Sequence, residues 1–199
     1  MAAWTLSVFK TRDPETMMTL YKSIVRSHVE YCCPLWNPTS LTLIQKLEDI
    51  QRDFTRRING LGNLSYWERL KRLGLMSLQR RRERYVLLIM WQILHGVLPN
   101  DLKITFRPEG RLGIQAILPR LPRNCSQRNR SLYDASFAVL GPCTWNQLPS
   151  WLNTIKSDAL FKQRLTKYLM ELDDEPPVQG YRRVHNNTLA DVTRRLQLR

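Results

Sequence analysis

Apolar and polar positions alternate with a helical period over most of the first hundred residues. Asp13-Pro14-Glu15 supplies a capping side chain, a proline at the first helical position and an early acid, which together predict a helix over residues 13–31. From Ser40 to Ile58 the apolar side chains recur every three or four positions, so they share one arc of a second helix. Asn59 and Gly60 are expected to end it.

Two further helices are expected before residue 100. Ser65 and Glu68 have the spacing of a capping box, in which each side chain satisfies a free backbone donor of the other, and the short helix that they begin should end at Gly74. A longer pattern predicts a helix over residues 77–95, closed by Gly96. The first half of the chain therefore reads as a helical bundle.

The helical period is lost after Pro99. Short apolar runs at residues 104–106, 112–118 and 132–140 are separated by Pro, Gly and Asn, and they favour short strands or extended loops. A helical stripe returns over residues 157–173, and the polar, basic residues beyond it favour a flexible tail.

These patterns predict a mainly α protein. It would have a helical bundle in the first half, an irregular segment with a few short strands, and one C-terminal helix. The expected divisions are a helical domain at 1–100, the irregular segment at 101–156, the C-terminal helix at 157–173 and a flexible basic tail at 174–199.

Composition adds a partner class to this picture. A hydrophobic content of 43% is enough for a core, while a formal net charge of +14 attracts polyanions. Nucleic acid is the leading candidate. A basic surface that is only solvated, and an acidic protein partner, stay open as alternatives.

The residues needed for catalysis or for metal binding are not arranged at useful spacings. Asp173 and Asp174 are adjacent, but they follow an amphipathic helix and precede two prolines, unlike the metal-binding pair that a polymerase carries on a strand hairpin. We expect no enzymatic activity, no cofactor, no bound metal and no small-molecule substrate. The cysteines are not spaced as zinc ligands; they are Cys32, Cys33, Cys125 and Cys143.

The sequence pattern also predicts no targeting signal and no membrane span. The first residues do not form the charged and apolar regions of a signal peptide. The longest apolar run, over residues 85–98, falls short of the roughly 20 residues that a membrane span requires. We therefore expect an intracellular protein of the nucleus or cytoplasm that is not secreted and has no membrane partner.

Basic residues form the candidate site. Arg52 and Arg56 lie opposite the apolar arc of the second helix, although Glu48 could neutralise Arg52. Positive charge in the first turns of the long helix opposes its macrodipole, and a phosphate bound to the free backbone donors there would relieve the conflict. Tyr66 and Trp67 are candidates for base stacking. The candidate nucleic-acid-binding residues are Arg52, Arg56, Arg69, Lys71, Arg72, Arg80, Arg81, Arg82 and Arg84.

A series of short sequence words strengthens this hypothesis. YKSIVRSHVEY at 21–31, PLWNP at 34–38, IQKLEDIQR at 44–52 and LSYWERL at 64–70 are followed downstream by WNQLP at 145–149 and FKQRL at 161–165. In this order and spacing they resemble the region just after the catalytic palm in reverse transcriptases of non-LTR retrotransposons, of the jockey and CR1-like kind. The resemblance covers roughly residues 14–172.

The resemblance implies a thumb and post-thumb region that grips template and primer. The fingers, the palm with its metal-binding aspartates and the endonuclease of that family have no counterpart here, so the resemblance implies a truncated fragment. The resulting hypothesis is a non-catalytic nucleic-acid-binding remnant that grips RNA or an RNA–DNA hybrid through backbone phosphates. The alternatives are a helix-mediated protein-interaction module, whose partner would be a polymerase palm on another chain, and an inert genomic relic.

Overall fold

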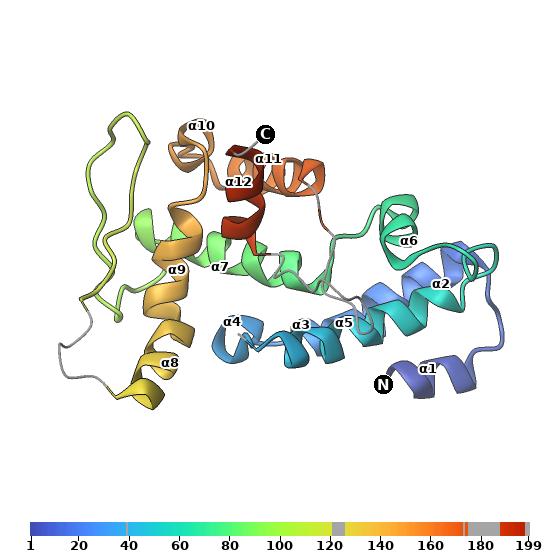
Figure 1. The fold of residues 1–199 in the computed structure, drawn as a ribbon. Helices are drawn as coiled ribbons and strands as arrows, with labels where there is room; N and C mark the ends of the chain where they lie inside the picture. The colour runs from blue at the N-terminus through green and yellow to red at the C-terminus, as the bar shows by residue number, and fades with distance from the viewer. Residues whose placement is uncertain (39, 121–125, 173, 175–187, 198–199) are drawn as a thin grey trace. The chain divides into compact units, whose positions relative to one another are not determined.

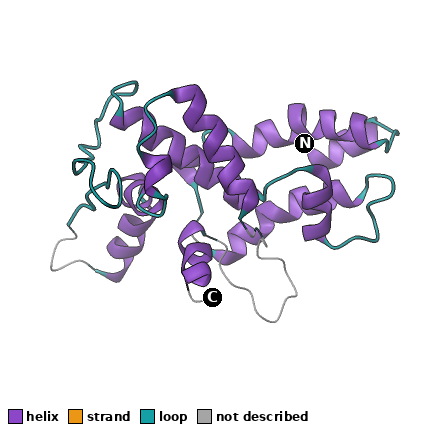
Figure 2. Ribbon diagram, turned by 90° about the horizontal axis from the view of Figure 1, so that it is seen from above, coloured by secondary structure: helices purple, strands orange, loops and turns teal. Residues whose placement is uncertain are grey.

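The computed structural model describes residues 1–38, 40–120, 126–172, 174 and 188–197. These residues are mainly helical, and their only β pairing is in isolated bridges, which confirms the predicted fold class (Figures 1 and 2). The elements in chain order are α1 (Ala2–Val8), α2 (Pro14–Leu20), η1 (Tyr21–Val25), α3 (Arg26–Glu30), α4 (Cys33–Trp36), α5 (Leu41–Arg56), α6 (Tyr66–Leu73), α7 (Leu78–Leu94), α8 (Gln127–Ala135), α9 (Phe137–Trp145), α10 (Ser150–Asn153), α11 (Asp158–Glu171) and α12 (Leu189–Gln197).

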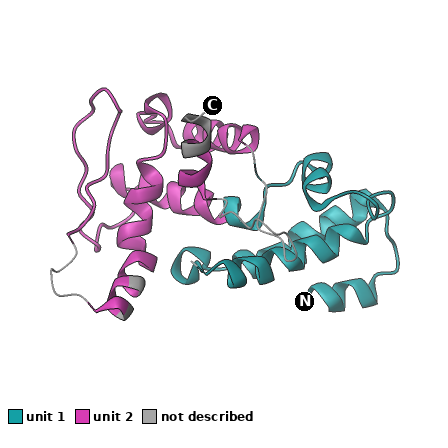
Figure 3. Cartoon of the chain, viewed as in Figure 1, with its two compact units in different colours: residues 1–81, 174–187 teal, residues 82–173, 188–199 magenta. Residues whose placement is uncertain are grey.

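The chain divides into two compact units (Figure 3). Unit 1 comprises Met1–Arg81 with Asp174–Asn187, and unit 2 comprises Arg82–Asp173 with Thr188–Arg199. The first boundary between them, after Arg81, falls within α7. The expected divisions after residues 100 and 156 fall inside unit 2, whereas residues 173 and 174 belong to different units.

The first expected helix of unit 1 is present as a continuous run of α2, η1 and α3. The Asp13 carboxylate accepts a hydrogen bond from the Thr16 backbone N–H at 3.0 Å, and Pro14 occupies the first turn, as the cap pattern predicts. The run changes to π-helical geometry over Tyr21–Val25. Its buried face contributes to the core of unit 1.

That core is formed by side chains from several helices of the unit. Their shared property is near-complete burial, and they include Met17, Tyr21, Val25, Phe54, Ile58, Leu61, Tyr66 and Leu70. The short α1 and α4 were not anticipated. Burial of Thr5 and Leu6 ties α1 to the unit, which is a tertiary effect that seven residues of sequence do not reveal.

The capping box predicted at Ser65 is confirmed. The Glu68 backbone N–H donates to Ser65 Oγ at 3.3 Å, and the Ser65 N–H donates to Glu68 Oε2 at 2.8 Å. Gly74 ends α6 with a φ of 60°, in the left-handed region that favours glycine. Both ends of α6 are therefore set by residues close together in sequence, the capping box at Ser65 and Glu68 and the glycine at Gly74.

Unit 2 is built around aromatic side chains. Trp145 and Phe161 are fully buried with ring centroids 6.0 Å apart, and the ring of Trp91 stacks on Phe161 at 5.8 Å. The Trp91 indole N–H donates to the Ile155 carbonyl at 2.7 Å. These contacts join α7, α9 and α11.

Part of the expected irregular segment is helical. Residues 132–135 belong to α8 and residues 137–140 to α9, so the extended conformation predicted for them is wrong. Ser126 caps α8 by accepting a hydrogen bond from the Asn129 N–H at 3.3 Å, and burial of Val139 and Trp145 supports α9. Residues 104–106 and 112–118 pair through the isolated bridge Phe106↔Ala116, and a second isolated bridge joins Gly110 to Gly113.

The predicted flexible tail also contains ordered contacts. Asp174 is buried, and α12 adds a second helix after α11. Leu189 and Val192 are buried, and the Leu189 N–H donates to Glu83 Oε1 at 2.6 Å. The few apolar side chains of α12 hold it in place because the rest of unit 2 provides a surface on which they pack. The rest of the expected tail lies outside the described residues.

Candidate nucleic-acid interface

The N-terminus of α7 is where a bound phosphate was expected. Its donors are instead satisfied by the chain itself. The Ser77 N–H and hydroxyl each donate to the Asp174 carboxylate at 2.7 Å, and the Gln79 N–H donates to Glu48 Oε1 at 2.7 Å. The Arg80 N–H donates to Ser77 Oγ at 3.0 Å. Two carboxylates thus occupy the anion-favouring end of the helix.

The arginines at the start of α7 make contacts within the chain. Arg80 and Arg82 are 0% and 2% exposed. The Arg81 guanidinium forms an ion pair with Glu30, donating to Oε2 at 2.9 Å, and Arg84 Nε donates to Thr166 Oγ1 at 3.0 Å. The expectation that these residues present positive charge outward assumed an exposed face. That assumption does not hold for Arg80 and Arg82, because both side chains are buried.

Arg69 has a structural position within unit 1. It is 4% exposed, and its guanidinium donates to the Leu64 carbonyl at 2.6 Å, the Thr55 hydroxyl at 3.2 Å and the Arg52 carbonyl at 3.2 Å. Burial lowers the pKa of Arg69 from its usual value. In this conformation Arg69 ties α6 to α5 and does not face solvent.

Tyr66 is likewise buried. Its hydroxyl donates to Glu48 Oε2 at 2.8 Å and accepts a hydrogen bond from Gln51 Nε2 at 2.8 Å. Gln51 Oε1 in turn accepts a hydrogen bond from the Tyr21 hydroxyl. Burial, and then the Glu48 charge, raise the pKa of Tyr66 well above 10.0. This buried polar network consists of Tyr21, Glu48, Gln51 and Tyr66, and it places Tyr66 out of reach of a base.

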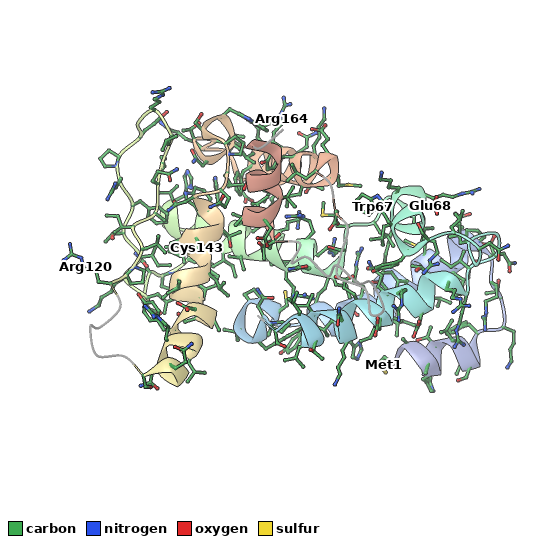
Figure 4. All side chains as sticks on the ribbon, in the orientation of Figure 1. Met1, Trp67, Glu68, Arg120, Cys143 and Arg164 are labelled. Atoms are coloured by element: carbon green, nitrogen blue, oxygen red, sulfur yellow. The ribbon has the colours of Figure 1, made fainter. Side chains whose placement is uncertain are left out.

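Trp67 differs from its neighbour. It lies on α6 (Figure 4) and is partly exposed. Lys71 Nζ sits 4.6 Å from the centroid of its ring. Adjacent Glu68 is held in the capping box with Ser65, so it does not neutralise Lys71. Trp67 is therefore the stacking candidate that the structure leaves accessible.

Four of the nominated basic residues remain at the surface of the packed helices α5 and α6. Arg52 is partly exposed and pairs with Asp49 at 2.9 Å and with Asp53 at 3.8 Å. Arg56, Lys71 and Arg72 are exposed and take part in no ion pair within the described residues. We call these four residues, Arg52, Arg56, Lys71 and Arg72, the α5–α6 basic surface.

Sequence reasoning missed the two capping carboxylates. Glu48 was taken as a surface partner of Arg52, yet it is buried and bonded to Gln79 and Tyr66. A signal existed, because Glu48 lies on the same arc of α5 as buried Ile44 and Gln51. No local signal could have paired Asp174 with Ser77.

Other site classes find no support in the described part of the chain. No group of three or more His, Cys, Asp and Glu side chains there could hold a metal ion. Cys32 and Cys143 are exposed free thiols and Cys33 is buried, while Cys125 and Asp173 lie outside the described residues. Among the described helices, none has the length and apolarity to cross a membrane.

Comparison with family models, with curated proteins and with solved structures found no match to this chain.

Proposed function

We propose that this chain binds RNA or an RNA–DNA hybrid through backbone phosphates and catalyses no reaction, as the resemblance to the thumb of a non-LTR retrotransposon reverse transcriptase implies. The observation that supports the proposal best is the exposure of Arg56, Lys71 and Arg72 in a chain of net charge +14. Each side chain extends a positive charge into solvent. Phosphate oxygens are the natural partners of such charges.

Arg56, Lys71 and Arg72 lie at positions where a positive charge is tolerated without a bound ligand. Arg56 lies in the last turn of α5, and Lys71 and Arg72 lie in the last turn of α6. Positive charge at a helix C-terminus interacts favourably with the macrodipole, so the surface remains folded with its charge unneutralised. A phosphate backbone across the α5–α6 basic surface would release its counterions on binding.

Trp67 gives the same surface a second kind of contact. Trp67 is partly exposed, and a base stacked on the accessible part of an aromatic ring contributes roughly 1 to 3 kcal/mol with little dependence on sequence. Lys71 beside the ring would hold the adjoining phosphate. The proposed binding is therefore tolerant of sequence and favours nucleic acid with an accessible unpaired base.

The test is fluorescence anisotropy of the full chain with a labelled RNA hairpin and a matched RNA–DNA hybrid over a salt series. The Arg56→Gln/Lys71→Gln/Arg72→Gln variant should weaken binding and lower the slope of log K against log salt by about 2 to 3. The matched control, Lys10→Gln/Lys22→Gln/Lys46→Gln, removes the same charge from other exposed positions of unit 1. Equal slopes for the wild type and the first variant would exclude this surface.

A protein-interaction module is the second candidate. Tyr31 and Leu35 are 76% and 84% exposed, and Trp36 beside them is also exposed, which is unusual for large apolar side chains that are so close in sequence. Static light scattering of the purified chain discriminates between the candidates. Self-association abolished by Leu35→Ser would favour the interaction module, whereas a monomer that binds no nucleic acid fits an inert relic.

A further inference from the structure

A second basic feature lies in unit 2, outside every residue that the sequence analysis nominated. Residues 103–120 form a long two-legged loop between α7 and α8, which we call the basic hairpin (Figure 1). Its legs pair through Arg107 N–H to the Gln115 carbonyl at 2.8 Å and Ile117 N–H to the Thr105 carbonyl at 2.8 Å. The Gly110↔Gly113 bridge closes the tip.

The side-chain amides of Asn146 and Asn153 anchor the inner face of the basic hairpin. Asn146 binds the backbone of Ala116 twice, accepting from its N–H at 2.8 Å and donating to its carbonyl at 2.9 Å. Asn153 accepts from the Ile114 N–H at 3.1 Å and donates to the Leu112 carbonyl at 3.2 Å. These amides replace the hydrogen bonds of a missing neighbouring strand. The hairpin is therefore held in one conformation without forming a sheet.

Because both legs of the basic hairpin are extended, successive side chains point to opposite faces of it. Ile104, Phe106 and Ala116 lie inward, where Ile104 and Ala116 are buried and the Phe106 ring approaches Trp145 edge-on at 6.3 Å. Arg107 and Ile117 alternate with them and are exposed. The inner face fixes the hairpin to unit 2, and the outer face is left to solvent.

Positive charge runs along the whole exposed length of the basic hairpin. Lys103, Arg107, Arg111 and Arg120 are exposed, and none of them takes part in an ion pair within the described residues. The Arg120 side chain points away from the ribbon in Figure 4. Two acidic residues, Asp101 and Glu109, lie nearby in sequence, but the net charge of this segment is still positive.

We infer that the basic hairpin is a second nucleic-acid contact, which holds the phosphate backbone with Arg107, Arg111 and Arg120. Guanidinium forks bind phosphate oxygens in pairs, and a hairpin whose conformation is already fixed loses little entropy on binding. The inference shares with the proposed function only the class of partner. Its residues, unit and anchoring are independent of the α5–α6 basic surface.

An anionic membrane is the other polyanion that such a hairpin could meet, since Leu112 at the tip is 67% exposed. The observations favour nucleic acid for three reasons. The charges are distributed along the hairpin and not around one end, and acidic Glu109 stands beside the tip. No aromatic residue occupies the tip region at 108–113, where an interfacial loop would carry one.

The experiment compares salt slopes of nucleic-acid binding for four full-length proteins. The Arg107→Gln/Arg111→Gln/Arg120→Gln variant should lower the slope on the RNA hairpin and on the hybrid by about 2 to 3. The matched control is Lys156→Gln/Arg164→Gln/Lys167→Gln, which removes three exposed charges elsewhere in unit 2 and should keep the wild-type slope. Unchanged far-UV circular dichroism verifies that each protein is folded.

The fourth protein, the α5–α6 triple variant described above, separates this inference from the proposed function. A lower slope in the hairpin variant alone supports the basic hairpin and overturns the α5–α6 basic surface. A lower slope in the α5–α6 variant alone overturns the hairpin contact. A wild type that does not bind at low salt overturns both.

Two further measurements address the residues and the partner. Saturating RNA should protect Arg107 and Arg111 from phenylglyoxal modification, as followed by mass spectrometry, while Arg164 should stay reactive. Vesicles of phosphatidylcholine with phosphatidylserine serve as the membrane probe. Sedimentation with these vesicles that is lost in Leu112→Ser, together with no RNA protection of Arg107, would overturn the inference in favour of a membrane contact.

Discussion

The Asp174 carboxylate accepts two hydrogen bonds from Ser77, one from its backbone N–H and one from its hydroxyl, each at 2.7 Å and across 97 positions of sequence. Together with Glu48 on the Gln79 N–H, this contact closes the N-terminus of α7. The arginines that follow it in sequence oppose the macrodipole, and these carboxylates offset that conflict. A phosphate ligand is not needed for the helix to begin there.

The Asp174 cap should be measurable in stability. Asp174→Ala removes the acceptor of two buried donors, so we expect the free energy of unfolding to fall by about 1 to 3 kcal/mol. Urea denaturation followed by circular dichroism measures the change. Asp53→Ala, which alters an exposed acid of α5, is the matched control. Equal denaturation midpoints for the two variants would contradict the capping role.

The buried tyrosines predict a loss of stability at alkaline pH. The folded-state pKa of Tyr66 lies well above 10.0, and burial also raises the pKa of Tyr21. Because the unfolded chain releases these protons near pH 10 and the folded chain retains them, the stabilising contribution is full below pH 10 and declines as the pH rises further.

The measurement for the alkaline effect is the denaturation midpoint between pH 8 and pH 11. The Tyr21→Phe/Tyr66→Phe variant should be less stable than the wild type at pH 8, because Gln51 and Glu48 lose hydrogen-bond partners. It should also show a shallower decline above pH 10. Parallel curves for the two proteins would refute the assignment to this network.

Substitution by alanine should destabilise the protein at Arg69 and have little effect at Arg56. Arg69→Ala removes three hydrogen bonds and a buried charged side chain, so we expect a destabilisation of about 2 to 4 kcal/mol. Arg56→Ala changes an exposed residue and should alter stability by no more than about 0.5 kcal/mol. Chemical denaturation of both variants checks this. A stable Arg69→Ala protein would mean that Arg69 is not a structural tie.

Gly113 should be intolerant of any side chain. Its φ is +72°, and a Cβ placed there would lie 1.9 Å from Asn153 Oδ1. Gly113→Ala must displace the amide that anchors the basic hairpin, so we expect a lower melting temperature and weaker nucleic-acid binding. Gly110→Ala is the control, because a Cβ at Gly110 meets nothing within 4 Å. The same melting temperature for both variants would show that the anchor is dispensable.

Several features of the fold were readable from local sequence. The cap at Asp13, the capping box at Ser65 and the stop at Gly74 are satisfied by residues within four positions, so sequence spacing alone predicts them. The apolar arc of α5 was equally visible, since a period of three and four is a property of one helix. Arg56, Lys71 and Arg72 stay at the surface, as an argument from helix faces expects.

Local sequence could not predict whether the arginines at the start of α7 are exposed or buried. Whether a charge at a helix end is exposed depends on which distant carboxylates arrive there, and Glu30 and Glu48 come from separate helices. The hairpin anchors show the same limit. Asn146 and Asn153 were ordinary polar positions in the sequence until the chain brought Ala116 and Ile114 beside them.

The sequence by itself thus determined the helical class of the protein, several helix ends and its excess of positive charge, because each depends on residue type and on spacing within a few turns. The tertiary structure alone decided which charges remain available. It buried Arg69, Arg80 and Arg82, and it left the α5–α6 basic surface and the basic hairpin exposed. The physical reason is that burial and hydrogen-bond satisfaction depend on contacts between residues far apart in the chain, which no local pattern encodes.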